Sequence, residues 1–499
     1  MAALVAITPL ALIVFLMIAL RWPAANAGLV GLVAAIIGAI FFFGFGTRVH
    51  GDQGVAAALT GTAAEAVFSA VDILWIILPA LSLYELQQRS GAIDAIRTGL
   101  MGLSSDKTLL AIIIALFFAL FMEGAAGFGT PIALAAPLIV SLGFSPAVAV
   151  ALPLIGHVAG VSFGALGTPI LAQVDVSGIG GDRIAPVTAF LHASLSPLLV
   201  LSMVFIAGNG RVQAKYAGWA IVGAVCFLLP YLCLAAWVGP ELPAIGGALA
   251  GGLAFAFVLR FRKERQAETP DARSLALGAI PYAVLVGLIL VTRLVPQIKD
   301  ASRQIVLQWT LPGPFAGRIE PLYHPGTMLL AGFVFGGLLQ GRTLAELATA
   351  VTAAVRRLVP VAIALLAMLG IARLMVHAGM TEALAAAATR TGWAWPLIAP
   401  SVGALGSFIT GSATASNILL TDLQQAAATD LGLPLLPLIA AQGFGAAIGN
   451  SVALHNIIAG AATVGLQGRE GDILRKTAPV CLVCLAAAGV LVLAAVLWS

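Results

Sequence analysis

The chain has 499 residues, of which 61% are hydrophobic and only 9% are charged. Soluble domains carry about 25% charged residues, so globular cores could not shield this much apolar surface from water. The composition therefore predicts an integral membrane protein, and a formal net charge of +4 gives no indication of nucleic-acid binding.

Long apolar runs, separated by charged residues or by Gly and Pro, follow one another along the whole chain. A helix needs roughly 20 apolar residues to cross a bilayer, and on this measure the runs give about 12 transmembrane helices with short loops. The first run, residues 4–20, has no basic residue before it and no small-residue cleavage site after it. We interpret it as a retained helix rather than a signal peptide. The expected fold is an all-α polytopic membrane protein in which residues 1–499 form a single domain.

Most of the 25 Lys and Arg residues lie in short segments between the apolar runs. These segments are Arg21, 89–107, 211–215, 260–273, 342–357 and 469–476. Lys and Arg favour cytoplasmic loops, and the spans between the segments allow all of them to share one side, which we assign to the cytoplasm. Both termini are then expected to face outward, and residues 296–325 form the longest polar outer loop.

A charged cytoplasmic linker, residues 260–274, divides the chain near its middle, and short similarities occur on either side of it. Ser90-Gly91 matches Ala378-Gly379, Leu142-Gly143 matches Leu431-Gly432, and Ile155-Gly156 matches Ile448-Gly449, in the same order and at nearly one shift. We therefore expect two repeats, approximately 66–207 and 353–499.

The two repeats are expected to be inverted. Gly91 lies in a basic, cytoplasmic segment, whereas Gly379 follows one apolar span after the basic pair Arg356-Arg357 and should face outward. Inverted repeats that hold a substrate near the bilayer midplane are typical of secondary transporters.

Each repeat contains membrane-depth segments rich in Gly, Pro and small polar residues. They are 123–131 and 156–169 in the first repeat, and 410–417 and 443–456 in the second. Irregular backbone at this depth is tolerated only where it lines a cavity or is buried in protein, so we expect broken helices and re-entrant hairpins. The free N–H groups and positive dipole of a half-helix can hold a carboxylate. Alternatively, the glycines only allow close helix packing, but packing would not require the accompanying Thr, Ser, Asn and His.

Several of these motifs resemble those of the lactate permease family, the bacterial carriers of L-lactate and glycolate. They are Glu123-Gly-Ala-Ala-Gly-Phe-Gly129, Val161-Ser-Phe-Gly-Ala-Leu-Gly-Thr-Pro-Ile170, Gly411-Ser412 with Ser416-Asn417, Gly449-Asn450 with His455-Asn456, and Ala462-Thr-Val-Gly-Leu466. The resemblance covers nearly the whole chain. It implies a twelve-helix inner-membrane permease that moves 2-hydroxymonocarboxylates together with protons, with a fold like that of the ion-transporter superfamily and its paired hairpins.

The candidate substrate-binding residues lie at the breaks, with one arginine from an apolar run. They are Gly127, Phe128, Gly129, Thr130, Arg373, Ser412, Thr414, Ser416, Asn417, His455 and Asn456. Arg373 could pair bidentately with a carboxylate, or it could extend to the outer interface or pair with a helix end.

Two ionisable residues are candidates for proton coupling. Glu123 follows about 15 apolar residues after Lys107, which places it deep in the membrane, where burial favours the protonated form of a carboxylate. It could instead cap free amides of the hairpin. His157, at the second break, titrates near neutrality, but it could equally be a hydrogen-bonded core residue.

Other functional classes find little support in the sequence. No zinc-protease, nucleophile-elbow or nucleotide-loop motif is present, so we expect neither an enzyme nor an ATP-driven pump, and we expect no cofactor or metal site. Cys481 and Cys484 lie within an apolar helix and are interpreted as packing residues. A channel, or a sodium-coupled carrier of another small organic anion, remains the alternative to a proton-coupled carrier. The sequence does not indicate the oligomeric state.

Overall fold

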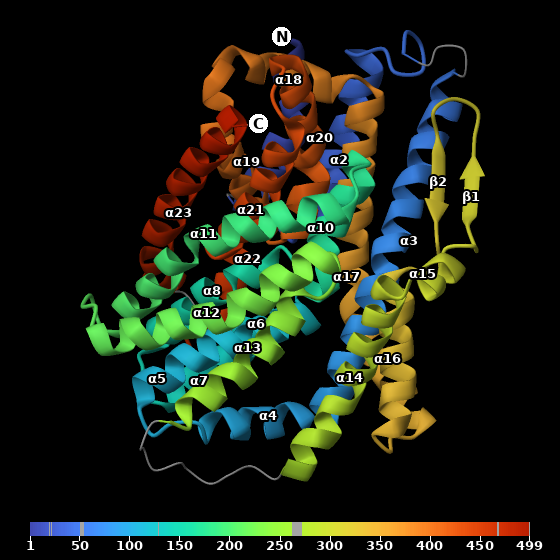
Figure 1. Cartoon of the computed structure of the whole chain (residues 1–499). Coiled ribbons are helices and arrows are strands. Elements are labelled where there is room, and N and C mark those ends of the chain that lie inside the picture. The colour runs from blue at the N-terminus through green and yellow to red at the C-terminus, as the bar shows by residue number, and fades with distance from the viewer. Residues whose placement is uncertain are drawn as a thin grey trace.

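The computed structural model describes residues 1–18, 20, 22–49, 54–127, 129–261, 272–466 and 469–498. Apart from one two-stranded hairpin, the regular structure in these residues is helical (Figure 1). Eight helical spans among them are long and apolar enough to cross a membrane, and further apolar helices are 10–17 residues long. The expectation of a helical, multi-pass membrane protein is thus confirmed, with long apolar helices and shorter ones together.

The first half of the chain begins with two helices and continues into a long series of packed helices. These are α1 (Ala2–Ile18), α2 (Ala24–Phe41), α3 (Gly54–Arg89), α4 (Ala92–Met101), α5 (Lys107–Ile113), the π-helix η1 (Ile114–Phe118), α6 (Ala119–Ala125), α7 (Thr130–Ser141), α8 (Pro146–Gly156), α9 (Val158–Val161), α10 (Gly164–Ser177), α11 (Gly181–Ala207), α12 (Ala214–Trp237) and α13 (Pro243–Leu259).

The second half contains the β-hairpin and a second series of helices. Its elements are α14 (Ala272–Leu294), α15 (Pro296–Ser302), β1 (Leu307–Thr310), β2 (Ala316–Ile319), α16 (Pro325–Leu339), α17 (Leu344–His377), α18 (Met380–Ala388), the 3-10 helix η2 (Thr389–Ala394), α19 (Trp395–Thr410), α20 (Ala413–Leu431), α21 (Leu435–Asn450), α22 (Leu454–Thr463) and α23 (Glu470–Trp498). Most of the linker at 260–274 lies outside the described residues.

The same succession of elements occurs in both halves. A long helix (α3 or α17) is followed by a short one (α4 or α18), a helical hairpin, a further helix, a break and a long final helix (α11 or α23). Glycines with positive φ occupy corresponding ends in the two series: Gly91 and Gly379, Gly127 and Gly411, Gly143 and Gly432, and Gly178 and Gly465. Only glycine adopts this conformation without a steric penalty. The short helices α4 and α18 lie at opposite ends of the molecule (Figure 1).

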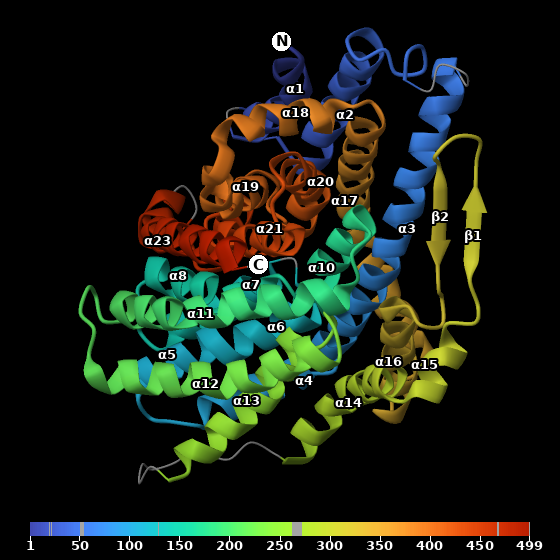
Figure 2. The same ribbon diagram turned by 45° about the horizontal axis from the view of Figure 1, so that its top comes forward.

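The central helices pack closely because glycines of one helix lie directly against the backbone of its neighbour. A Cβ atom added to Gly445 would lie 1.9 Å from the carbonyl oxygen of Pro400, and one added to Gly449 would lie 2.3 Å from that of Ala404. These two contacts hold α21 against α19, while α10 lies beside α20 (Figure 2). Elements from the two halves are therefore in direct contact at the centre of the molecule.

The β-hairpin in the segment 296–325 is a departure from the all-helical expectation. β1 and β2 pair antiparallel, with Leu307 opposite Ile319, and the turn between them contains Gly313 at φ 96°. Phe315 is 1% exposed and lies against Gly61 of α3, where an added Cβ would come within 2.2 Å of its ring. The hairpin is thus packed on α3, which a reading of helical apolar runs could not anticipate.

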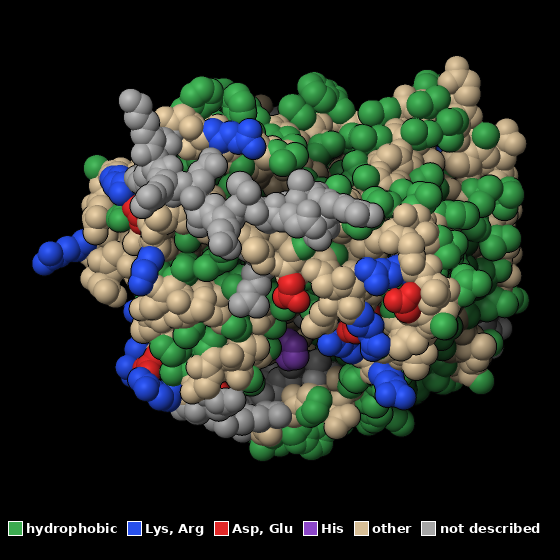
Figure 3. All heavy atoms as spheres, turned by 90° about the horizontal axis from the view of Figure 1, so that it is seen from below, with side chains coloured by type: hydrophobic (Ala, Val, Ile, Leu, Met, Phe, Trp, Pro, Cys, Tyr) green, Lys and Arg blue, Asp and Glu red, His purple; other side chains and the backbone are tan. Residues whose placement is uncertain are grey.

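Several groups of Lys and Arg side chains lie on the face seen from below, towards the left edge and the lower right of the view, and some of them have acidic side chains beside them (Figure 3). This face includes the end of the molecule at which α4 lies (Figure 1). Lys and Arg concentrate on the cytoplasmic side of membrane proteins.

Candidate substrate cavity

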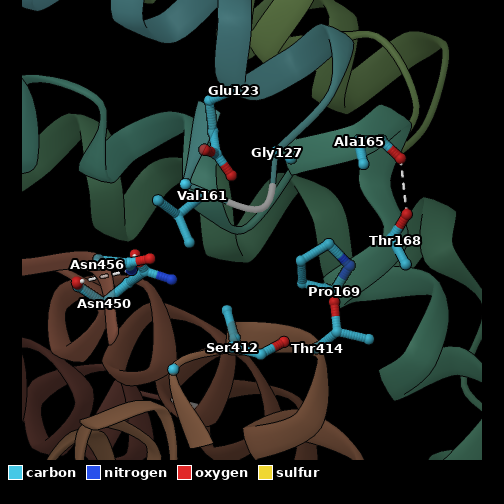
Figure 4. A pocket seen from close by; sticks show the side chains of 14 residues that line it. Glu123, Gly127, Val161, Ala165, Thr168, Pro169, Ser412, Thr414, Asn450 and Asn456 are labelled. Carbon is cyan, nitrogen blue, oxygen red and sulfur yellow. Dashed lines mark hydrogen bonds between the residues drawn. The ribbon is translucent and has the colours of Figure 1, made fainter. Parts of the chain in front are cut away.

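Two helical hairpins, one from each half of the chain, meet at a small cavity. The first consists of α6 and α7 with their connecting turn, and the second of α19 and α20 with the turn at Gly411-Ser412. The residues that line the cavity are Glu123, Gly127, Gly129, Val161, Gly164, Ala165, Thr168, Pro169, Gly411, Ser412, Ala413, Thr414, Asn450 and Asn456. Glu123 approaches this space from one side, and Ser412, Asn450 and Asn456 from the other (Figure 4).

Of the described residues that line the cavity, Glu123 is the only one with an ionisable side chain. It is 7% exposed and sits where two glycines of the neighbouring segment leave room for it. A Cβ atom added to Gly164 would be 2.3 Å from Glu123 Oε1, and one added to Gly160 would be 3.6 Å from Glu123 Cγ. The glycines of this segment therefore accommodate the carboxyl group, which no Lys or Arg of the lining neutralises.

His157 lies behind Glu123. Its Nε2 atom is 4.0 Å from Glu123 Oε2, and its Nδ1 atom is 2.5 Å from the carbonyl oxygen of Pro153. A carbonyl can only accept, so Nδ1 carries the hydrogen. In the neutral imidazole, Nε2 is then unprotonated and faces the carboxyl group across a short gap. The pair can therefore share a proton after a small movement.

The start of α10 is not helical. Ala165, Leu166 and Gly167 have positive φ values of 41°, 54° and 82°, although such conformations cost roughly 1–2 kcal/mol for each non-glycine residue. The Thr168 hydroxyl donates to the carbonyl oxygen of Ala165 at 2.6 Å and holds the bend. Strain of this kind is concentrated at functional sites, and here it turns the backbone along the cavity wall.

The second half supplies polar groups without charge. Ser412 caps α20, since its hydroxyl accepts the backbone N–H of Ala415 at 3.3 Å. The side-chain amide of Asn456 donates to the side-chain oxygen of Asn450, so the two amides form one unit at the cavity edge (Figure 4). The N-terminal ends of α7 and α20 border the cavity at Gly129 and Ser412, and such ends carry a partial positive charge.

The structure separates the residues proposed from sequence into two groups. Glu123, Gly127, Gly129, Ser412, Thr414 and Asn456 line the cavity, whereas Thr130, His157, Arg373, Ser416, Asn417 and His455 do not. Thr130 donates to the carbonyl oxygen of Gly127 at 2.8 Å and so fixes the turn of the first hairpin. Phe128 lies outside the described residues.

Ser416 and Asn417 belong to a buried network that joins the two halves. The Asn417 amide donates to the carbonyl oxygen of Pro169 at 2.9 Å, while the Ser416 hydroxyl donates to that of Gly403 at 2.8 Å. The Gln442 amide donates to Ser416 Oγ at 3.2 Å. These bonds position α20 against α10, α19 and α21, so the contribution of Asn417 to the cavity is through the backbone of Pro169.

His455 and Arg373 also lie outside the cavity lining. His455 is adjacent to Gly411, where an added Cβ would be 2.8 Å from the His455 Cβ, so it supports the second hairpin turn from behind. Arg373 Nη2 donates to Asp175 Oδ2 at 2.6 Å and to the Ser69 hydroxyl at 3.0 Å. In the conformation described, the guanidinium is thus used in an ion pair.

Some lining residues were not selected from the sequence. Val161, Gly164, Ala165, Thr168 and Pro169 lie in one of the glycine- and proline-rich segments, but nothing in that segment distinguished cavity-lining from packing positions. Asn450 is a polar residue within an apolar run, and this signal in the sequence could have identified it as a candidate ligand. Cys481 and Cys484 are buried and form no disulfide, in agreement with their interpretation as packing residues.

Comparison with solved structures gives the fold. The chain is similar to the YdaH transporter of Alcanivorax borkumensis, with a TM-score of 0.53 and 15% identity over 94% of this chain and 98% of that one. It is also similar to MtrF of Neisseria gonorrhoeae, described as one of a class of antimetabolite efflux pumps, with a TM-score of 0.51 and 15% identity over 93% and 94% of the two chains.

Comparison of sequences gives the family. The chain is 28% identical to an L-lactate permease of Bacillus subtilis, over 96% of this chain and 92% of the relative. It is 27% identical to a glycolate permease of Escherichia coli, over 99% and 95% of the two chains. The family model for L-lactate permease matches residues 2–498. The protein, a multi-pass membrane transporter and not an enzyme, therefore belongs to the L-lactate permease family.

Proposed function

We propose that the protein imports a small 2-hydroxymonocarboxylate, such as L-lactate or glycolate, together with a proton by alternating access. The observation that carries the proposal is the cavity between the two hairpins, with Glu123 as its single ionisable side chain. Relatives over nearly the full length are named as L-lactate and glycolate permeases, which supports the substrate class.

The cavity suits a small anion. The N-terminal ends of α7 and α20 offer backbone N–H groups and partial positive charge to a carboxylate, and the amides of Asn450 and Asn456 and the hydroxyl of Ser412 offer hydrogen bonds to a 2-hydroxyl group. Because the lining contains no Lys or Arg, the anion and an ionised Glu123 would repel each other. A protonated Glu123 removes this repulsion, so substrate and proton are expected to bind together.

A coupling cation is also required by energetics. A hydroxycarboxylate is ionised at neutral pH, and an inside-negative potential opposes its entry by about 2.3 kcal/mol per 100 mV. One co-transported proton cancels this charge. In this proposal Glu123 carries the proton, and His157, whose Nε2 atom lies 4.0 Å from Glu123 Oε2, can receive it.

The repeated element order and the paired positive-φ glycines support an inverted repeat, approximately 66–207 and 353–499. The positions of α4 and α18 at opposite ends of the molecule (Figure 1) favour the same interpretation. We assign the Lys- and Arg-rich face to the cytoplasm of a bacterial inner membrane, with both termini outward. Alternating access would then arise from movement of one hairpin-bearing unit relative to the other.

The test uses purified protein in sodium-free proteoliposomes. An acidic exterior should drive accumulation of labelled L-lactate, and Glu123→Gln should abolish accumulation while retaining some lactate exchange, because exchange does not require release of the proton. Glu346→Gln is the matched control, since Glu346 is exposed and its capping role at Thr343 is available to glutamine. Strict dependence on sodium would refute proton coupling, flux without saturation or counterflow would indicate a channel, and absence of lactate transport would refute the substrate class.

A further inference from the structure

A second group of ionisable side chains lies away from the cavity, between α3, α10, α17 and α20. The group contains two sets of contacts, each with one side chain from α3 and one from α17. In the first set, Arg373 Nη2 contacts Asp175 Oδ2 at 2.6 Å and the Ser69 hydroxyl at 3.0 Å. In the second, one helical turn further, His377 Nε2 contacts Glu65 Oε2 at 2.6 Å. The backbone N–H of Ala316, next to the β-hairpin turn, donates to Glu65 Oε1 at 3.0 Å.

Asp422 of α20 completes this group. It interacts electrostatically with Arg373, Asp175, His377 and Glu382, yet it forms no ion pair with any residue that the structure describes. The helices α19 and α21, which pack against α20, contain no ionisable side chain, and Arg390 of η2 is exposed. On α3, Asp72 lies near Asp175 and is paired with His324 at 3.1 Å. The helix that carries Asp422, α20, packs against α10, α17 and α18. Asp422 therefore faces the Arg373–Asp175 pair together with Glu382 and His377.

The charges of this group do not balance if every acidic residue is ionised. Glu65, Asp175 and Asp422 supply three negative charges, against which Arg373 supplies one positive charge and His377 at most one. Charges at membrane depth are costly and mark functional positions, and an uncompensated buried charge is usually neutralised by taking up a proton. Asp422 is partly buried, and of the three carboxyl groups it is the one without an ion-pair partner among the described residues.

Arg373 has unused hydrogen-bonding capacity. Within the described part of the chain, both of its hydrogen bonds come from Nη2, whereas its Nε atom is buried and has no hydrogen-bond partner there. An arginine that holds one carboxylate through a single nitrogen, with a second carboxyl group nearby, can exchange partners at little cost in hydrogen bonding. The two carboxyl groups come from different halves of the chain, Asp175 from α10 and Asp422 from α20.

We propose that Asp422, with Asp175 and Arg373, forms a second proton-binding site of the transporter. In the conformation described, Asp422 holds the proton on a carboxyl oxygen and Arg373 pairs with Asp175. When Asp422 releases its proton to water, the resulting carboxylate attracts Arg373 away from Asp175. The proposal rests on the transporter function proposed above, but it concerns residues that do not line the cavity.

The placement connects this site to the cavity. Asp175 follows Thr168 of the lining by seven residues along α10, and Asp422 follows Thr414 by eight residues along α20, so both lie about 10–12 Å from the cavity wall along their helices. A change of partner by Arg373 would alter the contact between these two helices and thereby the gap between the cavity walls. The geometry thus provides a physical link between proton binding and access to the substrate.

The experiment measures exchange of labelled L-lactate in sodium-free proteoliposomes at equal pH on both sides, over a series of pH values. In the wild type, we expect the exchange rate to change by up to about tenfold per pH unit over the pH range in which Asp422 titrates. Asp422→Asn imitates the protonated residue, so its exchange rate should not change with pH over that range. Asp422→Glu, which can still titrate, should restore this dependence of the exchange rate on pH. Asp430 is an exposed carboxylate on the same helix, and Asp430→Asn should leave the dependence unchanged.

The outcomes separate this site from the proposed function. A wild-type pH profile in Asp422→Asn, with accumulation still driven by the pH gradient, would refute the second site and leave the proposed function intact. If Asp422→Asn does not exchange lactate, lactate binding by the purified variant is measured over the same pH series, and an unchanged pH dependence of binding would again refute the site. Stimulation of wild-type exchange by sodium that is absent in Asp422→Asn would assign a sodium site instead and overturn the proposal.

Discussion

Replacement of Gly164 by alanine tests the placement of Glu123 most directly. The backbone at Gly164 has no positive φ, so alanine introduces no conformational strain. Its Cβ would lie 2.3 Å from Glu123 Oε1, whereas ordinary contact begins at 3.4 Å. The carboxyl group must therefore move by about 1 Å. Overpacking of this kind costs about 1–3 kcal/mol, which corresponds to a loss of roughly 5- to 150-fold in the equilibrium it perturbs.

The expected result is a loss of proton-driven lactate accumulation by a factor in this range, with the protein still folded. Accumulation is measured in proteoliposomes under an imposed pH gradient, and folding by size-exclusion chromatography and thermal unfolding in detergent. Gly218→Ala is the control, because an added Cβ there meets nothing within 4 Å.

A second variant makes the interpretation specific to Glu123. Glu123→Asp shortens the side chain by one methylene group and withdraws the carboxyl from the added Cβ. The combination of Gly164→Ala with Glu123→Asp should therefore lose less activity than the two single changes together predict, which is a measurable coupling between neighbouring residues. Wild-type accumulation by Gly164→Ala, or additive effects in the combination, would refute the contact between Glu123 and Gly164.

Three further predictions follow from the fold and its polar contacts. Single cysteines at Ser90 and Ala378, in a cysteine-free background, should react with a membrane-impermeant thiol reagent from opposite faces; reaction from the same face would contradict the inverted repeat. Asn417→Ala should lower the free energy of unfolding in detergent by about 1–3 kcal/mol, because it removes the amide that donates to the buried Pro169 carbonyl, and an unchanged melting temperature would argue against this role. Burial opposes ionisation of Asp106, but its hydrogen bonds with a lysine and with backbone N–H groups leave its pKa lowered. The ionised Asp106 therefore stabilises the folded state, by about 0.2–1 kcal/mol for a partly exposed pair. This contribution is present above the pKa of the unfolded state and is lost as the pH falls through the pKa of the folded state. Asp106→Asn should therefore make the melting temperature less sensitive to acid.

The membrane environment and the positions of the helix breaks can be predicted from local features of the sequence. A chain with 61% hydrophobic residues must lie in a membrane, and in lipid its backbone must be satisfied internally, which favours helices. Glycines such as Gly127 and Gly411 end those helices because their positive φ values suit glycine alone. These are local effects, so they can be predicted from neighbouring residues, and the approximate location of the cavity proposed to bind substrate follows from them.

Which polar side chains face the cavity depends on how distant segments pack together. Ser412 and Asn417 lie within one short segment, yet Ser412 lines the cavity while Asn417 binds the Pro169 carbonyl of the other half. Arg373 is paired with Asp175, 198 residues earlier in the chain. Helical periodicity fixes which residues share a face, but the partner of each face is set by contacts between distant segments. For that reason the sequence indicates that Arg373 could bind a carboxylate but not which one, and in the structure its partner is the carboxylate of Asp175.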